Sequence, residues 1–154
     1  MKIILGVDDS PFSHAAVDTV AAMKWPADTR IVVLSVARVP VGTYAMVDMP
    51  AVGTGTDWVD EQVRFHEEVA ARIERRLREA GLETEGRVML GDPREALVHA
   101  AESERAGLVV VGSHGRSGLT RLLLGSVASY VVTHAPCSVL VVKSPGPAAG
   151  SAQR

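Results

Sequence analysis

Five strand-like runs, separated by helical patterns, constrain the fold of this chain more than any other feature of its sequence. The runs lie at residues 3–7, 31–36, 84–90, 108–111 and 139–142. They are short and apolar enough to be buried on both faces, which is typical of strands in a parallel sheet. Because the runs alternate with helical patterns, the sequence predicts an α/β fold, an open parallel sheet with helices on both faces.

Two of the turns after predicted strands carry residues that start helices. Ser10 is expected to cap the first helix, and Pro11 suits its first position, where the missing N–H costs nothing. Asp92 and Pro93 give the same signal before the third helix. The last helix is expected over residues 122–132, after the fourth strand.

The least regular part of the chain is residues 37–56, between the second strand and the second helix. A segment of this length without regular structure is either a functional loop or an inert insertion. We favour a mobile loop near the ligand. Asp57 is expected to cap the long helix that follows, which runs to about residue 80 with Gly81 just past its end.

A glycine-rich stretch follows the fourth strand and contains Gly112, Gly115, Gly125 and Ser126. Gly112 and Gly115 permit positive φ angles and let a ligand approach the backbone closely. Backbone N–H groups in such a turn, with a hydroxyl nearby, suit phosphate oxygens. A turn needed only for packing is the alternative. The Walker loop and the dinucleotide fingerprint are both excluded, because the glycines have other spacings and the required lysine is absent.

The pattern that does fit is Gly-x2-Gly-x9-Gly-Ser, which runs from Gly112 to Ser126 without a gap. It resembles the nucleotide-binding branch of the universal stress protein family. The segments at the two ends of residues 1–143 are similar to the opening and closing strands of that family. The resemblance implies one family domain over these residues, with a Rossmann-like five-stranded sheet of order 3-2-1-4-5. Residues 144–154, rich in Pro, Gly, Ala and Ser, are expected to form a disordered tail.

The same resemblance implies an adenine nucleotide as the ligand. Asp8 would accept hydrogen bonds from the ribose hydroxyls, since an ionised carboxylate is an acceptor. A helix N-terminal carboxylate near Ser10 is the alternative role for Asp8. Val36 would pair with the adenine edge through its backbone. The other nucleotide-binding residues implied by the resemblance are Gly6, Val7, Val111, Gly112, Gly115, Gly125, Ser126 and Val127.

Three basic residues lie within or beside the glycine-rich stretch, namely His114, Arg116 and Arg121. They either neutralise phosphate charge or are simply solvated. No nucleophile with its base and orienting acid can be assembled from the sequence, and the histidines lack metal-ligand spacing. We therefore expect no catalytic residue and no metal site formed by protein ligands.

Composition argues against several kinds of partner and location. The formal net charge of -2 gives no overall attraction to nucleic acid or to an anionic membrane surface. No apolar run approaches the roughly 18 residues of a membrane span. A signal peptide is not expected, because the first apolar run is too short and ends in Asp8 and Asp9. We expect a cytoplasmic location, and the single Cys137 agrees with a reducing compartment.

The resemblance implies a stress-response regulatory protein that binds ATP and acts as a ligand-dependent switch toward an unidentified protein partner. Mg²⁺ is expected on the phosphates of ATP, with few or no protein ligands. The alternative is a slow ATPase or phosphotransferase, and glycine spacing leaves the choice among ATP, ADP and AMP open. We also expect a homodimer, because the run from Val139 to Val142 would be an exposed apolar edge of the sheet.

Overall fold

The structure is a computed structural model, and it describes residues 1–38, 56–115 and 124–144. The described residues contain a five-stranded sheet in which neighbouring strands are parallel, in the order β3-β2-β1-β4-β5. The predicted fold class is therefore confirmed. The strands are β1 (Lys2–Val7), β2 (Arg30–Ala37), β3 (Glu83–Leu90), β4 (Leu108–Gly112) and β5 (Ser138–Val142).

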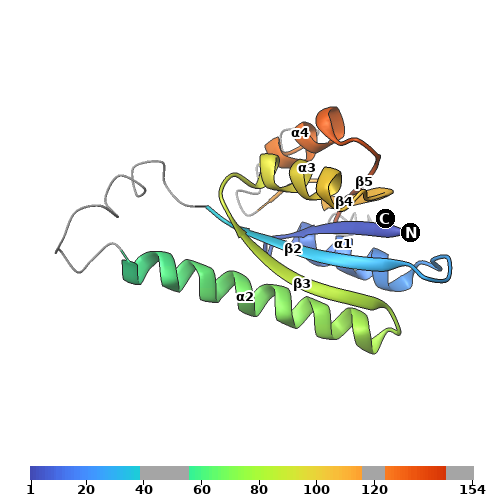
Figure 1. Ribbon diagram of the computed structural model, residues 1–154, viewed down its shortest axis with the longest axis horizontal. Helices are drawn as coiled ribbons and strands as arrows, with labels where there is room; N and C mark the ends of the chain where they lie inside the picture. Colours follow the sequence, from blue (N-terminus) through green and yellow to red (C-terminus); the bar gives the residue numbers. More distant parts are fainter. Residues whose placement is uncertain (39–55, 116–123, 145–154) are drawn as a thin grey trace, which may run out of the picture.

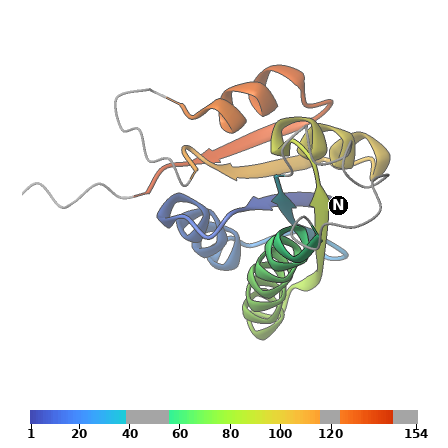
Figure 2. The same cartoon turned by 90° about the vertical axis from the view of Figure 1, so that its left-hand side faces the viewer.

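Two pairs of helices cover opposite faces of this sheet (Figure 1). Figure 2 shows the first pair on one side of the sheet and the second pair on the other. Buried side chains of the first pair belong to one apolar core, and those of the second pair belong to another. The first pair consists of α1 (Pro11–Ala22) and α2 (Thr56–Glu79), and the second pair consists of α3 (Pro93–Ser103) and α4 (Ser126–His134).

Alternate residues of each strand supply the two cores, because successive side chains of a strand point to opposite faces. In β1, Ile3 and Leu5 lie in the core under α1 and α2, whereas Ile4 lies in the core under α3 and α4. All three side chains are fully buried. Complete burial of each such side chain contributes about 1.5–3 kcal/mol. The central strand is thus held firmly from both sides.

The predicted helix starts after β1 and before α3 are both found. The Ser10 hydroxyl accepts a hydrogen bond from the backbone N–H of Ser13 at 3.1 Å. The Asp92 carboxylate accepts one from the backbone N–H of Arg94 at 2.9 Å. Each cap is followed by a proline in the first turn. Local sequence therefore fixes where both helices begin, directly after the carboxyl ends of strands.

Two predicted helix starts are displaced. The last helix was expected over residues 122–132, but α4 begins at Ser126 with Gly125 as its N-cap. The backbone N–H of Gly125 donates to the carbonyl of Ser113 at 2.7 Å, which ties the chain to the end of β4 just before the helix. The second helix begins at Thr56, one residue before the cap expected at Asp57.

Several predictions concern residues outside the described part of the chain. These are most of the loop at 37–56, the tail at 144–154 apart from its first residue, Arg116 and Arg121. None of the helices in the described residues combines the length and apolar character needed to cross a bilayer.

Candidate functional site

A pocket lies where the strand order of the sheet reverses. The first strand in sequence, β1, has β2 on one side and β4 on the other. Open α/β sheets bind ligands outside the carboxyl ends of their strands at such a position. Here a pocket of about 340 Å³ lies at the carboxyl ends of these strands. It is lined by every residue predicted for nucleotide binding: Gly6, Val7, Asp8, Val36, Val111, Gly112, Gly115, Gly125, Ser126 and Val127.

One part of the pocket is an apolar slot. Leu34 and Val36, two residues apart on β2, lie on the same face of the sheet, toward the core under α3 and α4. Pro93 and Leu97 of α3 line the pocket as well. A Cβ at Gly6 would lie 2.9 Å from a methyl carbon of Leu97 and 3.2 Å from one of Val111, so any larger residue there would force these side chains to shift. The slot suits a flat apolar group.

Sequence reasoning missed several residues that line the pocket. The place of Leu34 could have been predicted from the sequence, because a strand residue two positions before Val36 lies on the same face of the sheet. The α3 residues were not, because their place depends on how that helix crosses the sheet. The missed residues are Ser13, Leu34, Arg38, Pro93, Leu97, His114 as an assigned ligand residue, and Ala128.

The other part of the pocket is made of backbone and small residues. The hydrogen bond from Gly125 to Ser113 brings the two ends of the glycine-rich stretch together. Ser126 then starts α4, whose first N–H groups have no partners within the helix. Free helix N–H groups and the helix dipole favour anions by about 0.3–1 kcal/mol per charge. This side of the pocket therefore suits an anionic group.

The glycines of this turn are required for space rather than for a left-handed backbone. Neither Gly112 nor Gly115 has a positive φ, so the conformational freedom expected from the sequence is not used. A Cβ at Gly112 would lie 2.8 Å from the carbonyl carbon of Phe12 in α1. A Cβ at Gly115 would lie 2.8 Å from Oδ2 of Asp8. Gly112 therefore allows a close approach of backbone that a side chain would prevent, whereas a Cβ at Gly115 would require the end of the Asp8 side chain to move.

Asp8 makes the contact expected of a carboxylate at a helix start and also lines the pocket. Its Oδ1 accepts a hydrogen bond from the backbone N–H of Ser10 at 3.1 Å, as a carboxylate at a helix start does. Its Oδ2 lies toward Gly115 across the pocket. The backbone N–H of Asp8 donates to Oγ of Ser13 at 3.3 Å. The carboxylate is thus anchored through one oxygen and directed to the pocket with the other.

The histidine of the glycine-rich stretch also lines the pocket. The ring centre of His114 lies 5.1 Å from that of Phe12, and its Nδ1 lies 3.2 Å from Oγ of Ser113.

Among the residues that the structure describes, no three His, Cys, Asp or Glu side chains are grouped so that they could hold a metal ion. Burial raises the pKa of the Cys137 thiol, which is partly buried and packs against the core beneath α3 and α4.

A family model described as the universal stress protein family matches residues 1–143. The chain belongs to the universal stress protein family. It is 31% identical over 145 residues to the universal stress protein MJ0531 of Methanocaldococcus jannaschii, covering 94% of this chain and 82% of that protein.

Solved structures of universal stress proteins share the fold. The protein MJ0577, also from Methanocaldococcus jannaschii, superposes with a TM-score of 0.82 and 25% identity, over 95% of this chain and 97% of that one. A universal stress protein in complex with cAMP superposes with a TM-score of 0.61 and 25% identity, over 94% and 98% of the two chains. The five-stranded doubly covered sheet is thus the fold of this family.

Proposed function

We propose that this universal stress protein binds ATP in the pocket at the carboxyl ends of the strands and acts as a ligand-dependent switch in the stress response. The observation that carries the proposal is the meeting of Asp8 and Gly115 across the pocket. A side chain at position 115 would fill the space beside the carboxylate. The resulting cradle offers a carboxylate for sugar hydroxyls and backbone N–H groups for phosphate oxygens.

Each part of the nucleotide has a matching part of the pocket. The adenine ring fits the apolar slot, where the backbone of Val36 would pair with its edge. The ribose hydroxyls would donate hydrogen bonds to Asp8. The phosphates would lie against Gly112 and Gly115 and accept hydrogen bonds from N–H groups at the start of α4, which includes Gly125 and its neighbours Ser126 and Val127. This distribution separates the apolar and anionic ends of the ligand as the pocket separates its two halves.

The relatives support an adenine nucleotide in general. The cAMP-bound universal stress protein carries an adenine ring, a ribose and a phosphate, and it is 25% identical to this chain. The choice of ATP rests on the glycine pattern from Gly112 to Ser126. Mg²⁺ would be held chiefly by the phosphates and by water, since it keeps several waters in such sites. The cytoplasmic location expected from the sequence is part of the same proposal.

Titration calorimetry tests the proposal. ATP, ADP, AMP and cAMP are titrated separately into the purified chain, with and without Mg²⁺. We expect saturable one-to-one binding of ATP, and tighter binding of ATP than of AMP. Mass spectrometry of small molecules released from protein purified without added nucleotide gives an independent readout. Absence of saturable ATP binding at millimolar concentrations would contradict the proposal.

The enzymatic alternative, a slow ATPase or phosphotransferase, is separated from a switch by a phosphate-release assay. A switch without turnover releases no phosphate above the rate of ATP alone. Linear phosphate release that is abolished by substitution of Gly112 or Gly125 would favour the enzyme instead.

We also propose that the chain forms a homodimer through β5. This strand is the last in the sheet order, and its valines and leucine are only partly buried. An apolar strand edge is normally covered, because its unpaired N–H and C=O groups invite pairing with another chain. Sedimentation equilibrium at micromolar protein concentration is expected to give the mass of two chains. The mass of one chain would reject the dimer.

A further inference from the structure

Asp9, the residue after the carboxylate that we assign to the ribose, has a left-handed backbone with φ of 63°. This conformation is unfavourable for L-residues, although Asp and Asn tolerate it better than most. Glycine adopts it without steric penalty. The backbone alone would therefore favour glycine at this position, so the reason for an aspartate lies in the contacts of its side chain.

The Asp9 carboxylate is held by two different helices. Its Oδ1 lies 3.0 Å from Nε2 of His14 on α1, and it also pairs with the guanidinium of Arg72 on α2. The hydrogen bond with His14 is the largest cause that lowers the pKa of Asp9 below its ordinary value, and Arg72 lowers it further. Asp9 is therefore a charged link between the turn after β1 and both helices on that face of the sheet.

This link bears directly on Asp8. The carboxylate of Asp8 is anchored to the backbone N–H of Ser10, on the far side of Asp9. The backbone N–H of Asp8 is anchored to Ser13. Because Asp9 lies between Asp8 and Ser10, its φ angle sets how these two residues face each other. A change in the conformation of Asp9 would turn the Asp8 carboxylate away from its present direction.

We propose that Asp9 is a positioning residue for ribose recognition: through His14 and Arg72 it holds the turn between β1 and α1 so that Asp8 is directed into the pocket. None of these three residues lines the pocket. They act on the ligand through Asp8 rather than by contact. This inference rests on the proposed nucleotide binding and adds to it a group of residues that tunes recognition of the sugar.

The chain offers two matched controls. Arg76 of α2 pairs with Asp18 of α1, one helical turn beyond the partners of Asp9, and its side chain is 52% exposed against 56% for Arg72. That ion pair joins the same two helices without touching the turn. Asp28 has the same φ of 63° as Asp9, but it lies in the turn before β2, at the amino end of that strand and so away from the pocket.

The experiment compares ATP with 2′,3′-dideoxy-ATP, which lacks both ribose hydroxyls. Dissociation constants are measured by calorimetry for the unmodified chain and for Arg72→Ala, Asp9→Gly, Arg76→Ala and Asp28→Gly. We expect Arg72→Ala and Asp9→Gly to weaken ATP binding by about 3- to 10-fold, since they misplace one charged hydrogen-bonding group. Binding of the dideoxy analogue should change by less than about twofold, within the scatter of an unaffected site. The two controls should leave both constants unchanged.

The readout separates positioning from general stability. Loss of the fold would weaken the binding of ATP and of the dideoxy analogue alike, whereas a misplaced Asp8 carboxylate would weaken only the binding of ATP, which has the ribose hydroxyls. In an Asp8→Ala background, Arg72→Ala should have no further effect on ATP affinity, because its target is gone. An unchanged ratio of the two dissociation constants in Arg72→Ala and Asp9→Gly would overturn the inference while leaving nucleotide binding intact. An unmodified chain that binds neither ligand would overturn the proposed function, and this inference with it.

Discussion

The two ends of the sheet have hollows of similar size but opposite character. The carboxyl ends of the strands border a pocket of about 340 Å³, and the region where β1, β2 and β3 begin borders a hollow of about 390 Å³. The first is lined largely by glycines and apolar side chains, with Asp8, Arg38 and His114 as its ionisable residues. The second is lined largely by arginine, lysine and glutamate side chains. Volume alone therefore does not distinguish a ligand site from a surface groove.

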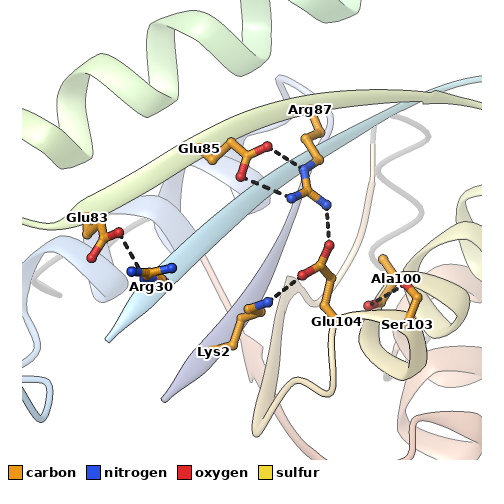
Figure 3. Close-up of polar contacts among 8 residues, drawn as sticks. All are labelled: Lys2, Arg30, Glu83, Glu85, Arg87, Ala100, Ser103 and Glu104. Carbon is orange, nitrogen blue, oxygen red and sulfur yellow. Dashed lines mark hydrogen bonds and ion pairs between the residues drawn. The ribbon is translucent and has the colours of Figure 1, made fainter. Parts of the chain in front are cut away.

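The charges at the amino end are paired with one another (Figure 3). Lys2 of β1 and Arg87 of β3 both contact the carboxylate of Glu104, just after α3, and Arg87 also donates to Glu85 at 2.6 Å. A ligand here would have to break these ion pairs. At the carboxyl end, the pocket is lined by glycines, by apolar side chains and by Asp8, one oxygen of which accepts a hydrogen bond from the turn before α1. The spacing of the glycines therefore indicates the candidate ligand site better than the number of charged side chains around a hollow does.

Removal of the Asp8 carboxylate is expected to give the largest difference in ATP affinity between a variant at the carboxyl end of the sheet and one at the amino end. Asp8→Ala should weaken ATP binding by about 10- to 150-fold, the equivalent of about 1.5–3 kcal/mol for a charged hydrogen bond. Calorimetric titration measures the loss. The matched control is Glu85→Ala at the amino end, which should leave affinity unchanged. If Asp8→Ala binds ATP normally and loses only stability, Asp8 serves the turn before α1 and nothing else.

Two glycines at opposite ends of β4, Gly107 just before it and Gly112 as its last residue, extend the comparison to packing. Gly112→Ala should lower the free energy of unfolding by about 1–3 kcal/mol, because the new Cβ meets the backbone of Phe12 and overpacks the contact. Gly107→Ala, just before the same strand, should lower the free energy of unfolding by less. There the new Cβ meets the flexible side chain of Met1 at 3.3 Å. Denaturant unfolding measures both, and equal losses would show that the close contact with α1 is unimportant.

Gly115→Ala should affect binding more than stability. Its Cβ would meet the end of the Asp8 side chain, which can rotate away, so the fold is preserved. ATP affinity should fall by about 3- to 10-fold as the carboxylate is displaced. Titration and denaturant unfolding on the same preparation give the two quantities. Full affinity in this variant would argue against a tight fit between the turn and the ligand.

Glu104→Gln should have the complementary effect at the amino end. It breaks contacts with Lys2 and Arg87. We expect a loss of about 1 kcal/mol in the free energy of unfolding, the upper part of the range for partly exposed ion pairs. ATP affinity should not change. A loss of affinity would mean that the two ends of the sheet are coupled.

The smallest expected effect is a pH dependence of that ion-pair group. Hydrogen bonds from Lys2 and then from Arg87 lower the pKa of Glu104 from 4.5 to about 2. Because the pKa is lower in the folded chain, the stabilisation is complete above the ordinary pKa and is lost as pH falls toward about 2. The difference in unfolding free energy between the unmodified chain and Glu104→Gln should therefore shrink between about pH 5 and pH 2. A constant difference would contradict the pairing.

Much of the fold could be predicted from the sequence because its signals are local. The caps at Ser10 and Asp92 lie next to the helices that they start, and alternation along each strand reports burial on two faces. The predicted site residues do lie around one pocket, because the carboxyl ends of parallel strands meet at one edge. Their role in binding stays a prediction.

What the sequence did not predict depends on contacts between distant segments. Arg72 is 63 residues from Asp9, and Glu104 is 102 residues from Lys2, so no local pattern links them. The need for glycine at position 112 comes from the approach of α1, not from a backbone angle. The start of α4 at Ser126 follows the hydrogen bond of Gly125 to Ser113, a contact between distant residues that the apolar sequence before Gly125 does not indicate.

An NMR titration with ATP and Mg²⁺ tests most directly which end of the sheet binds the nucleotide. Backbone amide shifts of an isotopically labelled sample are followed as ATP is added. We expect no changes at the amino end and the largest changes at Asp8, Gly112, Gly115, Gly125 and Ser126. Changes concentrated near Lys2, Arg87 and Glu104, or no saturable change at millimolar ATP, would contradict it.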